Sequence, residues 1–316
     1  LPFYKKLVLY ESTVMDQPVT CIRPAAHPFT ERLTTIPQPP RQICYLGHLP
    51  TAKSPANPVV AIVGSRKPSP YGIEVTKQFA QELAQAGCIV ISGLALGVDC
   101  IAQDAALQAG GTVLGVVADA LPAISPRANQ PLARRIIQQG GAILSEWQSG
   151  DGKIVSRWSF LQRNRLVSGL ADAVVITEAA ERSGTLNTAA HALDQGRDVF
   201  VVPGNITSRL SAGCNALLTQ GALPATQASD IITVIAPQRS APQSPQQVLL
   251  LASTPAEQTI IQLLAEGWRD GDQLQQRSHL SAADFSTALT MLEVNGSIKP
   301  LGANHWALTH RNQTDH

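Results

Sequence analysis

The sequence has few of the residues that mark the specialised classes of small proteins. Its 316 residues include only five cysteines, and no two of them are spaced as Cys-x-x-Cys. This pattern indicates neither a zinc site nor a disulfide framework. We expect Cys88 and Cys100 to be small apolar core residues, because both fall on apolar stretches.

Long apolar runs and an excess of one charge are also missing. No stretch is apolar enough to span a bilayer, and no basic segment leads into an apolar one as in a signal peptide. We therefore expect a cytoplasmic protein without a membrane partner. The 24 basic and 23 acidic residues give a net charge of +1, so any site for a polyanion must be a local patch. The chain starts at Leu1 rather than Met, so we expect an N-terminal portion to be missing.

The familiar catalytic and nucleotide motifs are absent as well. We find no His-x-x-x-His, His-x-Glu or Gly-x-Ser-x-Gly pattern, no Gly-x-Gly-x-x-Gly fingerprint and no P-loop lysine. The chain is therefore predicted to be a binding protein, with no catalytic residue and no metal site.

One stretch organises the rest of the chain, the apolar run Val59–Val63 followed by Gly64, Ser65 and Arg66. An unbroken aliphatic run of this kind is typical of a buried parallel strand. Glycine lets a ligand approach the backbone, serine offers a hydroxyl, and arginine offers a two-pronged donor for phosphate. The alternative is a plain strand–helix turn with a solvated arginine.

Strands and helices then alternate along the chain. Predicted strands cover residues 59–63, 88–93, 112–117, 142–147, 173–177 and 198–202. Predicted helices cover residues 71–86, 132–139 and 160–170, with two more ending near residues 109 and 196. This alternation predicts an α/β fold with a doubly wound, Rossmann-like parallel sheet. Residues 43–47 are predicted to add an edge strand.

The composition divides the chain into four parts. Residues 1–56 are a proline-rich lead-in, residues 57–235 form the Rossmann-like domain, and residues 236–252 are a linker rich in Pro, Gln and Ser. Residues 253–309 contain three predicted helices, at 257–266, 271–277 and 281–295, followed by a hairpin. That order is the plan of a winged helix-turn-helix domain.

Binding residues gather where the predicted strands end. Because the carboxyl ends of parallel strands share one edge of a sheet, we expect several glycines, hydroxyls and arginines to meet there. These candidates are Gly64, Ser65, Arg66, Gly93, Gly97, Arg182, Ser183, Gly184, Thr185, Gly204 and Asn205.

A helical cluster supplies an aromatic ring and further cations: Phe160, Arg163, Asn164 and Arg165. Arginines beside an aromatic ring are typical of sites that bind single-stranded nucleic acid: the arginines hydrogen-bond to phosphates, and a base stacks on the ring. The alternatives are a core aromatic for Phe160 and a solvated helix face for the two arginines.

The chain resembles the DNA-processing protein A (DprA/Smf) family across residues 57–235. The resemblance is carried by seven segments in order: Val63–Arg66, Ser92–Asp99, Gly140–Glu146, Phe160–Arg165, Glu178–Thr185, Val201–Asn205 and Gly213–Asn215. The tail resembles the family's winged-helix domain.

The resemblance implies a protein of natural transformation that binds and protects single-stranded DNA and loads the RecA recombinase onto it. It also implies a homodimer formed through the Rossmann-like domain, and no cofactor. Gly64, Ser65 and Arg66 would contact phosphate, and Phe160, Arg163 and Arg165 would line the path of the strand.

The sequence departs from the family at three places. Ala118-Asp119-Ala120 replaces the usual glycine-rich loop, and the family's helical N-terminal domain is not evident before Pro24. The last predicted tail helix, residues 281–295, has no lysine or arginine. Because a DNA-reading helix is normally basic, we expect the tail to bind a partner or to pack.

Two other functions fit the same layout. Lysine-decarboxylase-like phosphoribohydrolases share the Rossmann layout and hydrolyse nucleoside monophosphates. Here their catalytic glutamate is replaced by Thr188. A nucleotide-sensing fold without catalysis is the third possibility.

Overall fold

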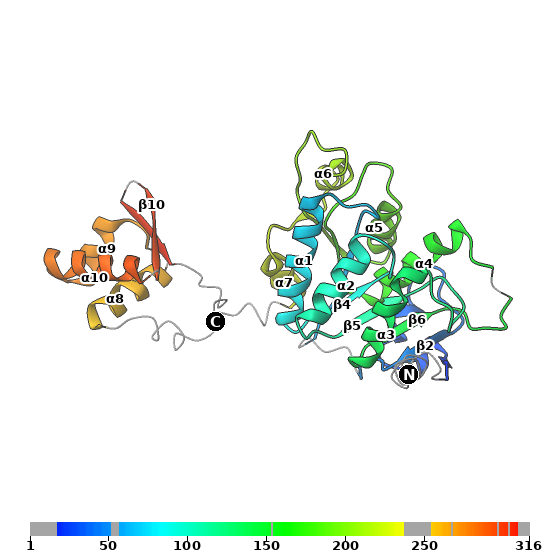
Figure 1. The fold of residues 1–316 in the computed structure, drawn as a ribbon. Coiled ribbons are helices and arrows are strands. Elements are labelled where there is room, and N and C mark those ends of the chain that lie inside the picture. Colours follow the sequence, from blue (N-terminus) through cyan, green and yellow to red (C-terminus); the bar gives the residue numbers. More distant parts are fainter. Residues whose placement is uncertain are drawn as a thin grey trace, which may run out of the picture. The chain divides into compact units, whose positions relative to one another are not determined.

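The computed structural model describes residues 18–51, 57–152, 154–236, 254–266, 268–295, 297–302 and 304–308 (Figure 1). The chain divides into two compact units, residues 1–240 and 241–316. Apart from Ala236, the expected linker lies outside the described residues. In the part of the chain that is described, no helix is long and apolar enough to cross a bilayer.

The first unit is built on a nine-stranded sheet in the order β1-β2-β6-β5-β4-β3-β7-β8-β9. Its strands are β1 Thr20–Ile22, β2 Ile43–Gly47, β3 Val59–Val63, β4 Ile89–Ser92, β5 Val113–Val116, β6 Ala142–Ser145, β7 Ala173–Ile176, β8 Asp198–Val201 and β9 Leu223–Pro224. From β6 to β9 all neighbours are parallel, while β1 and β2 pair antiparallel. The predicted α/β fold class is confirmed.

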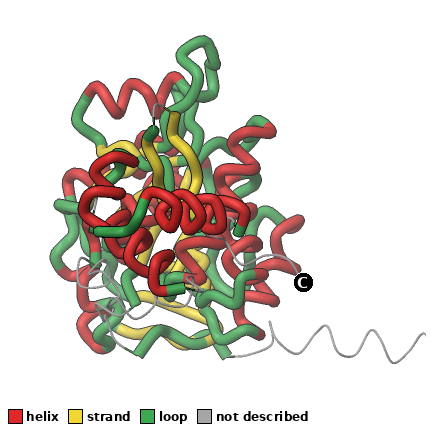
Figure 2. Tube along the Cα trace, turned by 90° about the vertical axis from the view of Figure 1, so that its left-hand side faces the viewer, coloured by secondary structure: helices red, strands yellow, loops and turns green. Residues whose placement is uncertain are grey.

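Helices cover both faces of this sheet, as the tube drawing in Figure 2 shows with helices in red and strands in yellow. One face packs against α1 Pro70–Gln85, α2 Val98–Gln108, α3 Gln130–Gln138 and α7 Ala228–Ile235. The other packs against α4 Arg157–Leu170, α5 Thr185–Asp194, α6 Ala212–Thr219 and the 3-10 turn Glu31–Thr34.

Strand β3 shows how the sequence pattern produces two cores. Val60 and Ile62 point into one core, while Val59, Ala61 and Val63 point into the other. All five side chains are buried, as expected for a central parallel strand whose two faces are both covered. The strand lies between β4 and β7, so the order of the sheet reverses beside it.

The N-terminal strands correct two expectations. Residues 43–47 form a strand, but the outer position belongs to β1. The antiparallel register places Cys21 opposite Cys44, and the two are joined by a disulfide. The expectation of no disulfide was wrong for this pair, because the cysteines are 23 residues apart and become neighbours only through strand pairing. Cys88 is buried and Cys100 half-buried.

The second unit has three helices and a hairpin, which confirms the winged-helix plan: α8 Pro255–Ala265, α9 Gly271–Ser278, α10 Ala282–Val294, β10 Ile298–Gly302 and β11 His305–Leu308. Thr254 and Ser281 cap α8 and α10 by accepting backbone N–H bonds. Ile260, Leu264 and Leu292 anchor a small core.

Candidate nucleic-acid interface

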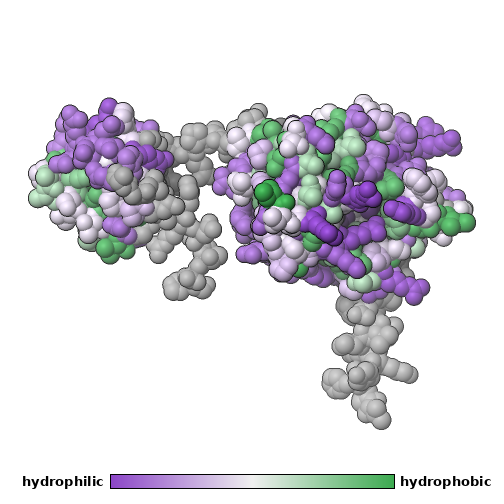
Figure 3. Space-filling model, turned by 90° about the horizontal axis from the view of Figure 1, so that it is seen from above, coloured by the Kyte–Doolittle hydropathy of each residue, from purple (hydrophilic) through white to green (hydrophobic). Residues whose placement is uncertain are grey.

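A cleft of about 580 Å³ opens at the carboxyl ends of β3, β4 and β7. Figure 3 looks down on this edge of the sheet and shows hydrophilic side chains, in purple, gathered across the middle of the face. The cleft is lined by Val63, Gly64, Ser65, Arg66, Gly93, Ala95, Asp99, Arg157, Phe160, Leu161, Arg163, Asn164, Val167, Ala180, Ser183, Gly184, Thr185 and Thr188.

Backbone contacts fix the turn after β3. The Ser65 N–H donates to the Glu178 carbonyl at 2.8 Å, and the Ser65 carbonyl accepts the Val98 N–H at 3.0 Å. Gly97 has φ of +82°, and a Cβ at this position would lie 2.3 Å from the Ser65 carbonyl oxygen. Only glycine therefore lets the loop after β4 lie against this turn.

Arg66 and Phe160 meet at the mouth of the cleft. The guanidinium carbon of Arg66 lies 5.5 Å from the centroid of the Phe160 ring, which is within cation–π range. Arg66 is exposed and makes no hydrogen bond to another described residue, so its donors are available. Arg157, in the first turn of α4, adds a second exposed cation to the lining.

Arg163 lies beneath the cleft and is 5% exposed. Its Nη1 donates to the carbonyls of Gly93 and Val116. The neighbouring Asp99 accepts the Gly93 N–H at 3.0 Å. Burial raises the pKa of the Asp99 carboxyl, against the opposing effect of Arg163, and burial lowers the pKa of Arg163. This buried pair holds the loop after β4 in place.

The N-terminus of α5 forms the opposite wall. Ser183, Gly184 and Thr185 line the cleft there, and the Thr185 hydroxyl donates to the Gly64 carbonyl at 2.9 Å. A helix N-terminus carries partial positive charge, which favours an anion, although the Thr185, Leu186 and Asn187 N–H groups here already donate to Ser183 and Gly184. Together with Arg66 and Arg157, this wall makes the cleft suited to a phosphate.

Comparison with known proteins identifies the family. The sequence model of DNA recombination-mediator protein A matches residues 20–236, and the DprA winged helix domain matches residues 237–304. The chain belongs to the DprA family.

Curated relatives carry DprA or Smf names. Protein Smf of Escherichia coli is 42% identical over 173 residues, which cover 55% of this chain and 46% of that protein. DNA processing protein DprA of Bacillus subtilis is 33% identical over 229 residues, which cover 72% of this chain and 75% of that protein. The chain thus spans less than half of the Escherichia coli protein but three quarters of the Bacillus subtilis one.

Solved structures of DprA proteins agree with the fold. DNA processing protein A from Helicobacter pylori, whose structure describes a single-stranded DNA binding mode, is 30% identical with a TM-score of 0.58. The match covers 70% of this chain and 96% of that one. DprA from Streptococcus pneumoniae is 34% identical with a TM-score of 0.61, over 73% of this chain and 78% of that one.

Ten of the fifteen DprA site residues expected from the sequence line this one cleft: Gly64, Ser65, Arg66, Gly93, Phe160, Arg163, Asn164, Ser183, Gly184 and Thr185. Gly97 packs directly behind its rim. Phe160 faces the cleft rather than the core, and Arg66 is not simply a solvated turn residue, since it contacts that ring.

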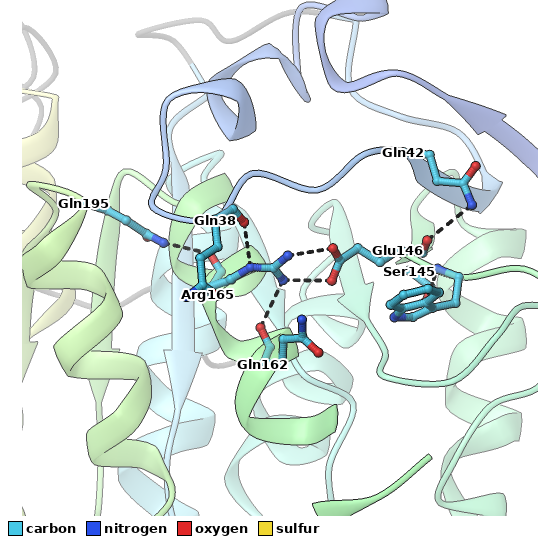
Figure 4. A network of polar contacts seen from close by, with 8 residues as sticks. Gln38, Gln42, Ser145, Glu146, Gln162, Arg165 and Gln195 are labelled. Atoms are coloured by element: carbon cyan, nitrogen blue, oxygen red, sulfur yellow. Dashed lines mark hydrogen bonds and ion pairs between the residues drawn. The ribbon is translucent and has the colours of Figure 1, made fainter. Parts of the chain in front are cut away.

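Arg165 is not in the cleft. It is 3% exposed and forms a two-pronged ion pair with Glu146, with distances of 2.6 and 2.8 Å (Figure 4). Its Nε also donates to the Gln38 carbonyl at 2.9 Å. The expectation that Arg165 lines the path of a strand was therefore wrong: this side chain joins α4 to the end of β6 and to the N-terminal segment.

Three other expected residues lie apart from the cleft lining. Arg182 is exposed. Gly204 and Asn205 line a second, smaller hollow next to the cleft, beside Glu178.

Arg157 was missed by the sequence analysis. The apolar pattern predicts a helix that starts only at Phe160, which leaves Arg157 outside it. The helix instead starts at Arg157, after Ser156, whose side chain forms a capping box with Ser159. The serine pair three residues apart is the signal that could have extended the helix and placed Arg157 one turn before Phe160.

The cleft lining has few side chains that could act as a general acid or base. Thr188 lines it at the position where a phosphoribohydrolase carries its glutamate. Asp99 is the only carboxylate among the lining residues, and it is engaged by Gly93. Among the described residues, no group of His, Cys, Asp or Glu is placed to hold a metal ion.

Proposed function

We propose that this DprA-family protein binds single-stranded DNA in the cleft, with little sequence preference and without catalysis. The observation that carries the proposal is the pairing of Arg66 with Phe160, 5.5 Å apart at the mouth of the cleft. One group binds a phosphate and the other stacks on a base, so a single nucleotide can engage both.

The rest of the cleft favours the sugar–phosphate backbone over base edges. Two further lining arginines and the N-terminus of α5 place positive charge in it, against one carboxylate. Backbone contacts of this kind position a strand without reading its sequence. The Helicobacter pylori relative, described for its single-stranded DNA binding mode, supports the same assignment.

We extend the proposal to two cellular roles: the protein loads RecA onto single-stranded DNA, and it acts in DNA uptake. Family membership supports them, together with a homodimer formed through the sheet unit. RecA loading is tested by whether the protein speeds RecA filament formation on DNA coated with single-strand-binding protein. The homodimer is tested by the mass of the protein in solution, measured by light scattering.

The competing function is hydrolysis of nucleoside monophosphates. It needs a carboxylate at the position of Thr188, and the lining of the cleft offers only Asp99, which is bound to the Gly93 N–H. Release of free base from a nucleotide would support this function and count against the proposal.

A direct test is a gel shift with matched single-stranded and double-stranded oligonucleotides at several salt concentrations. We expect tighter binding of the single strand, little dependence on its sequence, and affinity that falls as salt rises. Equal or tighter binding of the duplex contradicts the proposal.

A further inference from the structure

A second hollow of about 370 Å³ lies on the same edge of the sheet, beside the cleft. It is bounded by Ser69 and Tyr71 at the start of α1, by Glu178 after β7, and by the loop of residues 203–211 after β8. None of the roles assigned above uses it.

The charge of this hollow is opposite to that of the cleft. No lysine or arginine lines it, and the Glu178 carboxylate, 2% exposed, faces it. Both carboxylate oxygens are already occupied, because they accept the Ser69 hydroxyl at 2.5 Å and the Ser69 N–H at 2.8 Å. A phosphate would meet a negative charge here without a cation, so the hollow suits a neutral group.

Polar donors in the hollow lack partners. Ser211 is 4% exposed and lines the hollow, yet its hydroxyl bonds to no other described residue. The Asn205 Oδ1 accepts bonds from Thr207, which leaves the Asn205 amide NH₂ without a described partner. The Ser211 hydroxyl is not among the fully buried polar atoms without a partner, and Asn205 is exposed, so both side chains are open to hydrogen-bond a group that enters the hollow.

An aromatic ring stands at the edge of the same hollow. Tyr71 is 45% exposed, and its hydroxyl donates to the Pro203 carbonyl at 2.8 Å. The bond holds the ring to the loop while leaving part of it open. A held aromatic ring beside uncharged donors matches the chemistry of a nucleobase, which has a π-face and a polar edge.

The hollow and the cleft share a wall. Ser65 lines one and Ser69 the other, and four residues of chain span at most about 14 Å. The residue that bounds the hollow, Glu178, accepts the Ser65 N–H through its carbonyl. A single strand advances about 3.4 Å per nucleotide when stacked and more when extended, so a few nucleotides cover this distance.

We propose that the hollow formed by Tyr71, Glu178, Gly204, Asn205 and Ser211 is a subsite for one nucleobase of a strand whose phosphate is held in the cleft. The inference rests on the proposed function. It assigns the cleft to a phosphate and to the base that stacks on Phe160, and the hollow to a second base, which stacks on Tyr71 and bonds to Ser211.

The test uses the full chain and labelled oligo-dT of increasing length, with binding followed by fluorescence anisotropy at several salt concentrations. Tyr71→Ala weakens binding about tenfold for oligonucleotides long enough to reach both sites, with an unchanged salt slope, and leaves the shortest ligands unaffected. Tyr71→Phe keeps the ring but loses its bond to the Pro203 carbonyl, so it recovers most of the affinity that Tyr71→Ala loses. Gly204→Ala places a methyl group against the Ser211 hydroxyl and weakens the same long ligands.

Two further variants serve as controls: Arg66→Ala tests the cleft, and Leu193→Ala tests a position outside both sites. Leu193 is an exposed apolar residue that lines neither site, and its loss leaves binding unchanged. Arg66→Ala weakens ligands of every length, and an absence of that effect would overturn the proposed function itself. If Arg66→Ala weakens binding while Tyr71→Ala matches the wild type at all lengths, only the subsite is overturned.

Photo-cross-linking gives an independent readout. Oligo-dT carrying 5-iodouracil should attach to the peptide that contains Tyr71 as well as to the one that contains Phe160. Attachment at Phe160 alone, or a Tyr71→Phe variant as weak as Tyr71→Ala, overturns the base subsite.

Discussion

Arg66 and Arg165 have the same side chain but opposite environments. Arg66 is exposed, contacts the Phe160 ring, and makes no hydrogen bond to another described residue. Arg165 is buried, and its donors are taken by Glu146, Gln38 and Gln162. Substitution at the first should therefore change binding, and substitution at the second should change stability.

We expect Arg66→Ala to weaken single-stranded DNA binding by about 1.5–3 kcal/mol while the protein stays folded, because one charge-assisted phosphate contact is lost. The slope of log K against log salt should flatten by about 0.7, which titrations at several salt concentrations measure. Lys67→Ala is the matched control: Lys67 is exposed in the same turn but outside the cleft lining, so its loss should matter less. Unchanged affinity and slope for Arg66→Ala would remove the turn as a phosphate site.

Arg165→Ala should lower the free energy of unfolding by about 3–5 kcal/mol, because it leaves the Glu146 carboxylate without its partner at a largely buried site. Urea denaturation followed by circular dichroism measures the change. Arg135→Ala breaks a pair with Asp104 whose side chains are 42% and 37% exposed, and it should cost less than about 1 kcal/mol. Equal losses for the two variants would contradict the structural role of Arg165.

At this scale, the sequence could place Arg66 at the edge of the sheet, but it left Phe160 open between the cleft and the core and did not distinguish Arg163 from Arg165. Strand ends gather by topology, so Gly64, Ser65 and Arg66 could be placed at the edge. Arg163 and Arg165 are two residues apart and project from different sides of α4. Helical periodicity assigns each a side, but the depth of burial depends on distant carbonyls and on Glu146.

At the scale of elements, the continuous apolar strands were predictable even at four or five residues, while several other elements were not. The six apolar strands and α1 were expected within one or two residues at each end. Helices α6 and α7 and the two-residue strand β9 were missed, although α9, which also has eight residues, was expected. The Cys21–Cys44 disulfide was missed because β1 has only three residues, and its register fixes the pairing.

The loop between β4 and α2 offers a test of how elements shape the cleft. Gly97→Ala should lower stability by about 1–3 kcal/mol and also weaken DNA binding, because the new methyl group would meet the Ser65 carbonyl. Gly110→Ala is the control, since Gly110 has a similar φ of +78° with no atom near the added Cβ. It should share the backbone strain but leave binding intact, as thermal melts and anisotropy titrations can show. Normal binding by Gly97→Ala would mean that this contact does not shape the site.

At the scale of the whole molecule, the sheet unit and the winged-helix unit have separate cores. On the described residues of α10, the exposed face includes Ala283, Thr287, Met291 and Val294 and has no lysine or arginine. Such a face offers no cation to a DNA backbone. We therefore expect the sheet unit to supply most of the DNA affinity.

A chain that ends at residue 240 should fold and keep its affinity for single-stranded DNA within about tenfold, or about 1.4 kcal/mol. Circular dichroism and anisotropy measure the two properties on the same sample. An insoluble product, or complete loss of binding, would show that the tail contributes to the site.

The central place of β3 also has a consequence for biosynthesis. Its neighbour β4 follows within about 30 residues, but its other neighbour, β7, pairs through Ala173 with Val60, more than 100 residues earlier. The wall formed by α5 comes later still. A nascent chain emerging from the ribosome therefore completes its sheet centre late, and we expect it to acquire the cleft only after Thr188 has left the exit tunnel.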